Sequence, residues 1–312
     1  MASTPSRDFD RLVQNIYSLA VDDWTVFRQN ALERLCMHFG AVGAAWLTLP
    51  GKGIGGEFSE WPFEAGHTRE QLESIKFPSG KRDVELNPLG EKLQGSVAVD
   101  GEVGFAVRYS HRGADLTSIL MLRFPPGSPL SDADALRRAV GHVVEANTLA
   151  LRYFIQRDEW LQSMGRSSRG TAALVDQSGT IYAASKAFRD MVGTECGDRE
   201  FTRLPSGLPQ EVIDEEGTFS WGSLHFRVSH HKNLYLLHVR APLPLDGLSP
   251  REQEIARALG AGKTFKSVAR QYDIAVSTVA NHASRIYRKL GVYRREDLVQ
   301  LVRKPGNDRK TH

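Results

Sequence analysis

The chain has 312 residues, 41% of them hydrophobic and 25% charged, and a formal net charge of +3. These values are ordinary for a globular protein and allow two or three separate cores. No segment approaches the length of a membrane span, and the opening residues MASTPSRDFDR lack the apolar run of a signal peptide. We therefore expect a cytoplasmic protein without a membrane partner.

Residues 1–163 predict a domain made of an antiparallel sheet with helices against it. The expected elements are, in chain order, a helical region at 9–39, a strand at 44–49, a helix at 68–75, strands at 103–109 and 117–124, and a long helix at 131–161. This order resembles GAF-like sensory domains. The resemblance implies a pocket between the open face of the sheet and the segment that covers it.

Aromatic residues gather on the first strand and in the lobe that follows it. They are Trp46, Phe58, Trp61, Phe63 and Phe77. As a group they either enclose a mostly apolar effector or form ordinary core, and the sequence leaves both interpretations open. The sequence also leaves two roles for the apolar residues of the long helix, which either seal the core of this domain or pair two subunits.

Residues 169–242 predict a second, smaller α+β domain. The expected elements are strands at 171–175 and 180–183 around a DQSG turn, a helix capped near Ser185, and strands at 222–229 and 233–240. The stretch ALVDQSGTIYAASKAFRDMVG resembles a short PAS domain. Its histidines at 225, 230, 231 and 238 suit a solvated hairpin better than a metal or haem site.

The two cysteines, Cys36 and Cys196, are far apart and have no Cys-x-x-Cys or histidine partner spacing. Cys36 is expected to be a small core residue. We expect no metal, no disulfide framework and no cofactor.

The most informative stretch is LSPREQEIARALGAGKTFKSVARQYDIAVSTVANHASRIYRKLGV, from Leu248 onward. Ser249 is expected to be an N-cap, with Pro250 in the first turn and Glu252 completing a capping box. Gly260 and Gly262 then end the first helix. A second helix is expected from about Thr264 to Asp273 and a third from about Ser277 to Leu290, closed by Gly291.

The third predicted helix has an apolar stripe formed by Val279, Ala283, Ile286 and Leu290. Its outer face has the chemistry of a recognition helix, because arginine and asparagine can make paired hydrogen bonds to base edges in the major groove. Asn281, Ser284 and Arg285 are the predicted base-reading residues. The residues suited to phosphates are Lys266, Ser277, Thr278, Arg288 and Lys289. A solvated basic face is the alternative, but the caps and the tight turn between short helices favour DNA.

This stretch resembles the LuxR-type, or GerE-like, helix-turn-helix. The resemblance lies in Leu248-Ser249-Pro250-Arg251-Glu252, Val268-Ala269, Ser277-x-Val279-x-Asn281-His282 and Lys289-Leu290-Gly291-Val292. It implies an all-α, four-helix domain at 247–304, in which the third helix enters the major groove and the fourth, at about 294–302, pairs two subunits. The family usually has lysine after Val279. Here that residue is Ala280, so one contact is missing or is moved to Arg285.

Charge separates this unit from the rest of the chain. Residues 247–312 contain 14 lysines and arginines against 6 acidic residues, a net charge of +8, whereas the preceding residues contain 26 against 31, a net charge of −5. A basic module attached to an acidic body is typical of a nucleic-acid-binding protein with additional domains. Residues 305–312 are expected to form a loose tail.

These patterns predict a multidomain α+β protein: a GAF-like α/β sensor, a PAS-like domain and a helix-turn-helix. We expect a LuxR-type transcriptional regulator that binds double-stranded DNA at an inverted repeat as a homodimer and responds to a small-molecule effector. Control by a protein partner is the alternative. The N-terminal half lacks the early acidic pair expected of a receiver domain, which argues against a phosphorylation-driven response regulator. The additional PAS-like region does not suit the two-domain plan of homoserine-lactone sensors. No Gly-x-Ser-x-Gly motif, P-loop or metal-ligand spacing supports an enzyme.

Overall fold

The computed structural model describes residues 5–51, 56–87, 89–93, 101–128, 130–163 and 171–303. The chain forms two compact units. The first comprises residues 1–221 and 226–240, and the second comprises residues 222–225 and 241–312. The expected tail at 305–312 lies outside the described residues. The domain boundaries expected from the sequence stay predictions.

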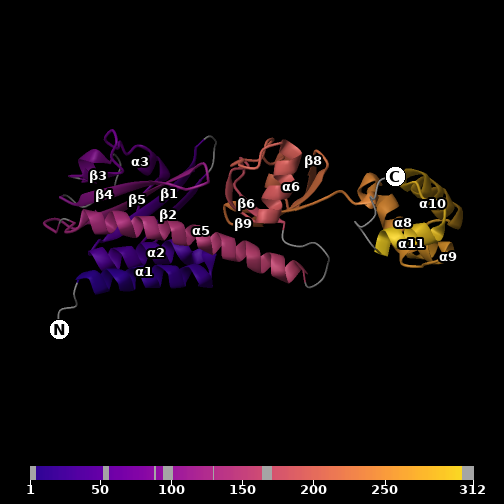
Figure 1. The fold of residues 1–312 in the computed structure, drawn as a ribbon, viewed down its shortest axis with the longest axis horizontal. Coiled ribbons are helices and arrows are strands. Elements are labelled where there is room, and N and C mark those ends of the chain that lie inside the picture. The colour runs from indigo at the N-terminus through magenta and orange to yellow at the C-terminus, as the bar shows by residue number, and fades with distance from the viewer. Residues whose placement is uncertain are drawn as a thin grey trace. The chain divides into compact units, whose positions relative to one another are not determined.

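The first unit begins with an antiparallel five-stranded sheet in the order β2-β1-β5-β4-β3 (Figure 1). Its strands are β1 (Gly43–Pro50), β2 (Glu57–Trp61), β3 (Asp83–Leu86), β4 (Val103–Ser110) and β5 (Leu116–Phe124). The sequence predicted β1, β4 and β5, which are confirmed. It missed the edge strands β2 and β3, because EFSEW and DVEL are short and carry acidic residues that weaken the apolar pattern.

Helices α1 (Pro5–Asp22), α2 (Trp24–Phe39) and α5 (Ala133–Ser163) pack together on one face of this sheet (Figure 1). The helical region expected at 9–39 is therefore two helices. They are separated at Asp23, whose carboxylate accepts the Thr25 N–H at 2.8 Å and caps α2. The core between these helices and the sheet includes Ile16, Phe27, Leu35, Cys36, Trp46, Leu120, Leu136 and Val140. Cys36 is a buried core residue, as expected.

Helices α3 (Arg69–Glu73) and α4 (Leu89–Lys92) lie against the opposite face of the sheet. Thr68 and Gln71 form a complete capping box at the start of α3. A second core fills this face and includes Ala45, Leu47, Leu72, Leu89, Leu93 and Met121. Apolar side chains of the protein itself thus pack on both faces of the sheet.

The five aromatic residues, which the sequence left open as an effector site or as ordinary core, do not converge on one cavity. Trp46 and Trp61 belong to the core beneath α1, α2 and α5, Phe58 and Phe77 pack on the opposite face, and Phe63 is 75% exposed. The cause is the alternation of side chains along a strand. Ser59 is opposite Trp46, and Phe58 is opposite Leu47, so Trp46 and Phe58 leave the sheet on different faces.

Trp46 has a structural role that the sequence did not reveal. The guanidinium of Arg28 lies 4.1 Å from the centroid of its ring, and Arg28 Nη2 donates to the Trp46 carbonyl at 2.7 Å. Arg28 Nη1 also forms an ion pair with Glu57 Oε2 at 3.0 Å. The indole Nε1 donates to Ser118 Oγ at 3.0 Å. These buried partners fix Trp46 within the core.

The second sheet of this unit has the order β7-β6-β10-β9-β8. Its elements are β6 (Ala172–Val175), β7 (Ile181–Ala184), α6 (Lys186–Cys196), α7 (Gln210–Asp214), β8 (Gly217–Trp221), β9 (Leu224–His231) and β10 (Leu234–Arg240). The strands predicted for this region are confirmed, as is the cap, since Ser185 Oγ accepts the Phe188 N–H at 3.2 Å. The sequence missed the short strand β8 and the helix α7. In both sheets the order of strands is second, first, fifth, fourth, third.

Helix α5 contributes to both parts of the first unit. Its residues Leu136 and Val140 belong to the core of the first sheet, whereas Leu151 and Ile155 pack against residues of the second sheet such as Tyr182. These four apolar positions of the long helix therefore seal cores within one chain. Pairing of two subunits through α5 stays a prediction.

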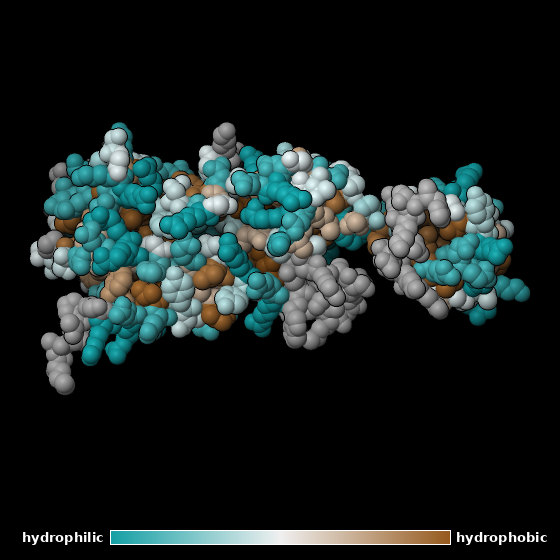
Figure 2. Space-filling view, viewed as in Figure 1, coloured by the Kyte–Doolittle hydropathy of each residue, from teal (hydrophilic) through white to brown (hydrophobic). Residues whose placement is uncertain are grey.

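Hydrophilic residues dominate the part of the described surface that faces the viewer in Figure 2. None of the helices in the described ranges is long and apolar enough to cross a membrane. Within those same ranges, no group of three or more His, Cys, Asp or Glu side chains is arranged to hold a metal ion.

Candidate nucleic-acid interface

The second unit contains η1 (Pro244–Gly247), α8 (Pro250–Gly260), α9 (Phe265–Gln271), α10 (Val276–Leu290) and α11 (Arg295–Arg303). The expected start of α8 is confirmed in detail. Ser249 caps the helix, and the Ser249 N–H donates to Glu252 Oε2 at 2.9 Å, which completes the capping box. The helix ends at Gly260, followed by Ala261 and Gly262.

The turn between α9 and α10 determines where and in which direction the third helix, α10, begins. Thr264 caps α9 by accepting the Ser267 N–H at 3.2 Å. After α9, Asp273 adopts φ 49°, a left-handed conformation that reverses the chain in few residues. Helix α10 then begins after Ala275, which has no side chain able to cap it, and ends at Gly291 with φ 66°.

The core of this unit fixes which face of α10 is exposed. Val279, Ala283 and Ile286 of α10 are buried against Ile255 and Leu259 of α8, Val268 of α9 and Leu298 of α11. The fourth helix lies close to α8 because residue 260 is glycine: a Cβ atom there would lie 2.5 Å from Val302 Cγ2. The predicted inward stripe is confirmed, and its partly buried last member is Leu290.

With this face buried, the other face of α10 presents polar side chains along its length. Ser277, Asn281, Ser284, Arg285, Arg288 and Lys289 are exposed, and Thr278 is half-buried. Lys266 is exposed on α9. Residues 277, 281, 284 and 288 recur at the three- and four-residue spacing of one helix face. The Ser284 hydroxyl donates to the Ala280 carbonyl at 3.0 Å, within the helix.

The cations of this unit divide into two groups. Some are held by other parts of the domain: Arg251 pairs with Glu254 at 2.8 Å and lies over Tyr272, and Arg295 donates to the Lys263 carbonyl at 2.8 Å. Others make no hydrogen bond or ion pair within the part of the chain that the structure describes. This second group includes Lys266, Arg270, Arg285 and Arg288, and the side chain of Arg294 shares this property. These side chains are available to an external anion.

Lys289 differs from the other predicted phosphate-binding residues. Its Nζ lies 2.7 Å from Glu252 Oε2 on α8. The hydrogen bond from Lys289, together with the Ser249 N–H, lowers the pKa of Glu252 to about 2. The sequence missed this role, because the two residues are 37 positions apart.

Two further residues of the exposed surface were not singled out from the sequence. Arg270, one turn after Lys266 on α9, is exposed and unpaired within the described ranges. Val276, the first residue of α10, is 44% exposed. The sequence missed Val276 because the predicted helix began only at about Ser277, whereas α10 begins one residue earlier.

Residues 246–302 match the family described as "Bacterial regulatory proteins, luxR family" (GerE). A curated relative, the "Probable HTH-type transcriptional regulator GfsR" of Streptomyces halstedii, is 37% identical over 70 residues. That match covers 22% of this chain and 29% of the length of GfsR.

Solved structures give weaker similarities. Escherichia coli SdiA is 12% identical with a TM-score of 0.31, and the match covers 89% of this chain and 90% of SdiA. A structure of the Vibrio cholerae VqmA dimer is 15% identical with a TM-score of 0.20, and the match covers 46% of this chain and 85% of that one. TM-scores at this level support no inference about the rest of the chain.

The capped helices, the tight turn and the exposed polar face of α10 define a helix-turn-helix DNA-binding domain. Residues 246–302 belong to the LuxR family of bacterial regulatory proteins, as the resemblance in the sequence implied.

Proposed function

We propose that the whole chain is a LuxR-type transcriptional regulator that binds double-stranded DNA through the exposed face of α10. The observation that carries this proposal is the group of unpaired cations Lys266, Arg270, Arg285 and Arg288 around a polar helix face in a LuxR-family domain. Cations that are free of intramolecular partners can displace the counterions of the DNA backbone. Such a role places the protein with its DNA in the cytoplasm.

The side chains of α10 divide by chemistry into two roles. Asn281 and Arg285 can make paired hydrogen bonds to base edges in the major groove, and Ser284 adds a rotatable hydroxyl. Lys266, Ser277, Thr278 and Arg288 would fix the domain on phosphates. We assign Lys289 to the stability of the domain instead, because Glu252 already holds its ammonium group.

We further propose that the protein acts as a homodimer on an inverted repeat. Two copies of α10 related by a two-fold axis would read two half-sites, and their spacing would depend on the geometry of the dimer. A signal received by the first unit would alter DNA affinity if it favoured one of two dimer geometries. The small-molecule effector is the leading form of that signal, and a protein partner is the alternative.

The direct test selects duplexes that bind the full chain from a random pool and then measures affinity over a range of salt concentrations. We expect one enriched inverted repeat, a dimer on that duplex by sedimentation, and an affinity that falls steeply with salt. Arg288→Ala should make the logarithm of affinity fall less steeply with the logarithm of salt concentration, by the contribution of about one phosphate contact. A pool that remains random, with affinity no greater than that of Arg288→Ala, would overturn the proposal.

A further inference from the structure

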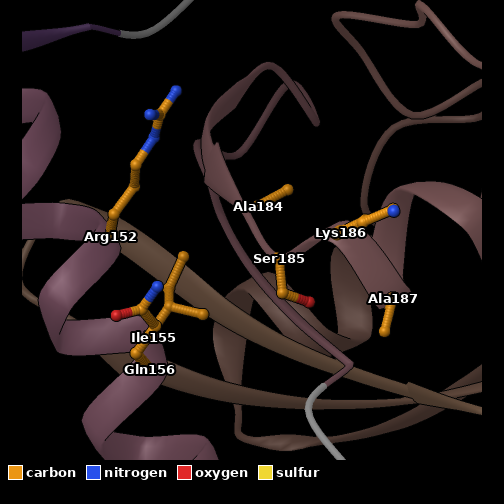
Figure 3. A pocket seen from close by; sticks show the side chains of 7 residues that line it. All are labelled: Arg152, Ile155, Gln156, Ala184, Ser185, Lys186 and Ala187. Atoms are coloured by element: carbon orange, nitrogen blue, oxygen red, sulfur yellow. The ribbon is translucent and has the colours of Figure 1, made fainter.

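A cavity of about 410 Å³ lies in the first unit, between α5 and the start of α6 (Figure 3). One wall is formed by Arg152, Ile155 and Gln156 of α5, and the other by residues 184–187, where β7 leads into α6. Its volume falls within the range of about 300–1,000 Å³ that small-molecule sites occupy. Neither the fold nor the DNA-binding role accounts for this cavity.

The cavity has cationic side chains on both walls. Arg152 extends from α5 on one side, and Lys186 lies on the other (Figure 3). Neither makes a hydrogen bond or an ion pair with any residue in the ranges that the structure describes. The residues lining the cavity include no carboxylate. Positive charge from two elements therefore lines this cavity, and its lining residues supply no counter-charge.

A third cation lies close to this pair. Arg189, one turn after Lys186 on α6, donates through Nη1 to the Phe201 carbonyl at 3.1 Å. Burial, and then the nearby charge of Arg152, lower the pKa of Arg189. Like charges repel one another, and a bound anion would offset that repulsion by its attraction to each cation.

The remaining lining favours a ligand with a short carbon skeleton. Ile155 is buried, and Ala184 and Ala187 add small apolar surfaces opposite it. Gln156 offers an amide that can donate or accept a hydrogen bond. Polar and apolar side chains thus line one cavity.

We propose that this cavity binds a small organic anion, whose negative charge is attracted by Arg152 and Lys186 from the two walls and whose carbon skeleton contacts Ile155. The role of this anion as the effector rests on the proposed function, whereas its binding to the cavity does not. The anion would connect α5, which completes the core of the first sheet, to α6 on the second. Binding would therefore restrain the two parts of the first unit against each other.

The test measures binding to the full chain without DNA, so its failure is distinct from a failure of the DNA-binding proposal. Inorganic phosphate and succinate are titrated calorimetrically at constant ionic strength, with glycerol as a neutral control. We expect saturable binding of at least one anion and none of glycerol. The anion that binds more tightly identifies the headgroup as phosphate or carboxylate.

Variants locate the site. Arg152→Ala and Lys186→Ala should each weaken binding by about tenfold or more, the usual effect of losing one charge-assisted hydrogen bond. Arg152→Lys keeps the positive charge and should retain part of the affinity. Arg34→Ala removes an exposed cation from α2 and should bind as the wild type does. Absence of saturable binding by both anions, or equal affinity in Arg152→Ala, Lys186→Ala and Arg34→Ala, would overturn the inference.

Discussion

Lys289 Nζ lies 2.7 Å from Glu252 Oε2, and this ion pair ties the last turn of α10 to the capping box of α8. The carboxylate of Glu252 has a side chain only 6% exposed and also accepts the Ser249 N–H. Two segments that define the LuxR resemblance in the sequence are thus joined by one contact in the structure. The adjacent Arg288 has no such partner in the described ranges, so neighbouring cations of one helix have different roles.

Lys289→Met should lower the thermal stability of the protein, because it leaves the enclosed carboxylate of Glu252 without its counter-charge. Arg288→Met is the matched control and should leave the melting temperature unchanged while it weakens DNA binding. Thermal unfolding of both variants, followed by DNA titration, separates the two roles. A Lys289→Met variant that unfolds with the wild type but binds DNA as weakly as Arg288→Met would contradict this division.

The same pair should make the second unit sensitive to acid. The pKa of Glu252 is about 2 in the folded protein and 4.5 ordinarily, so the folded state favours the charged form. Its stabilising contribution is complete above about pH 4.5 and is lost as pH falls towards 2. Glu252→Gln should remove that part of the pH dependence. Unfolding of both proteins across this interval, monitored by α-helical circular dichroism, provides the check.

His67 and His111 should destabilise the first unit at mildly acidic pH. Burial, followed by the charge of Arg123 for His67 and of Arg28 for His111, lowers each pKa from 6.5 to about 4. Below pH 6.5 the unfolded chain takes up protons that the folded chain resists, so stability falls as pH decreases to about 4. The free energy of unfolding should fall with decreasing pH at a slope that approaches about 1.4 kcal/mol per pH unit for each histidine.

Urea unfolding between pH 4 and 7 measures that slope. His67→Leu should flatten it by the share of one histidine, whatever the variant does to stability at pH 7. His142→Leu is a control in the same unit, on α5. An unchanged slope in His67→Leu would show that this ring is protonated in the folded state.

Gly260→Ala should destabilise the helix-turn-helix, because the new Cβ would lie 2.5 Å from Val302 Cγ2 where α8 meets α11. Overpacking of this kind typically costs about 1–3 kcal/mol. Gly247→Ala is the control, since a Cβ at that position meets nothing within 4 Å. Chemical denaturation of both variants tests the contact, and equal stabilities would mean that the two helices can separate without cost.

Ala275→Ser should stabilise α10. Ala275 occupies the N-cap position with φ −67° and ψ 148°, the extended conformation of capping residues, but it has no side-chain acceptor. A serine there should add about 1 kcal/mol to the free energy of unfolding. Ala275→Asp should stabilise the helix in the same way but weaken DNA binding, because its carboxylate would face phosphates. Denaturation and DNA titration of the two variants distinguish these effects.

The sequence predicted most of the second unit because its signals are local. Ser249, Thr264 and Gly291 mark helix ends within a few residues of the helices they cap, and the apolar stripe of α10 can be read along one element. The role of Lys289 could not be predicted in this way, because its partner comes from a different helix.

The first unit shows the same limit. Its long helix and the strongly apolar strands β1 and β5 were predicted, whereas the short strand β2 was not. Without β2, the register that puts Phe58 and Trp46 on opposite faces was unknown. The sequence could not decide between an effector site and ordinary core for these aromatics for that reason. The cavity between α5 and α6 depends on packing between distant segments, which no local pattern indicates.

The central claim is that α10 reads bases while α9 contributes charge alone, and one set of affinities tests it most directly. The full chain, Arg285→Ala and Lys266→Ala are each titrated onto the selected inverted repeat and onto a random duplex of equal length at fixed salt. We expect Arg285→Ala to lose about 1–3 kcal/mol on the selected repeat and little on random DNA, and Lys266→Ala to lose similar amounts on both. Equal losses on the two duplexes for both variants would contradict the claim.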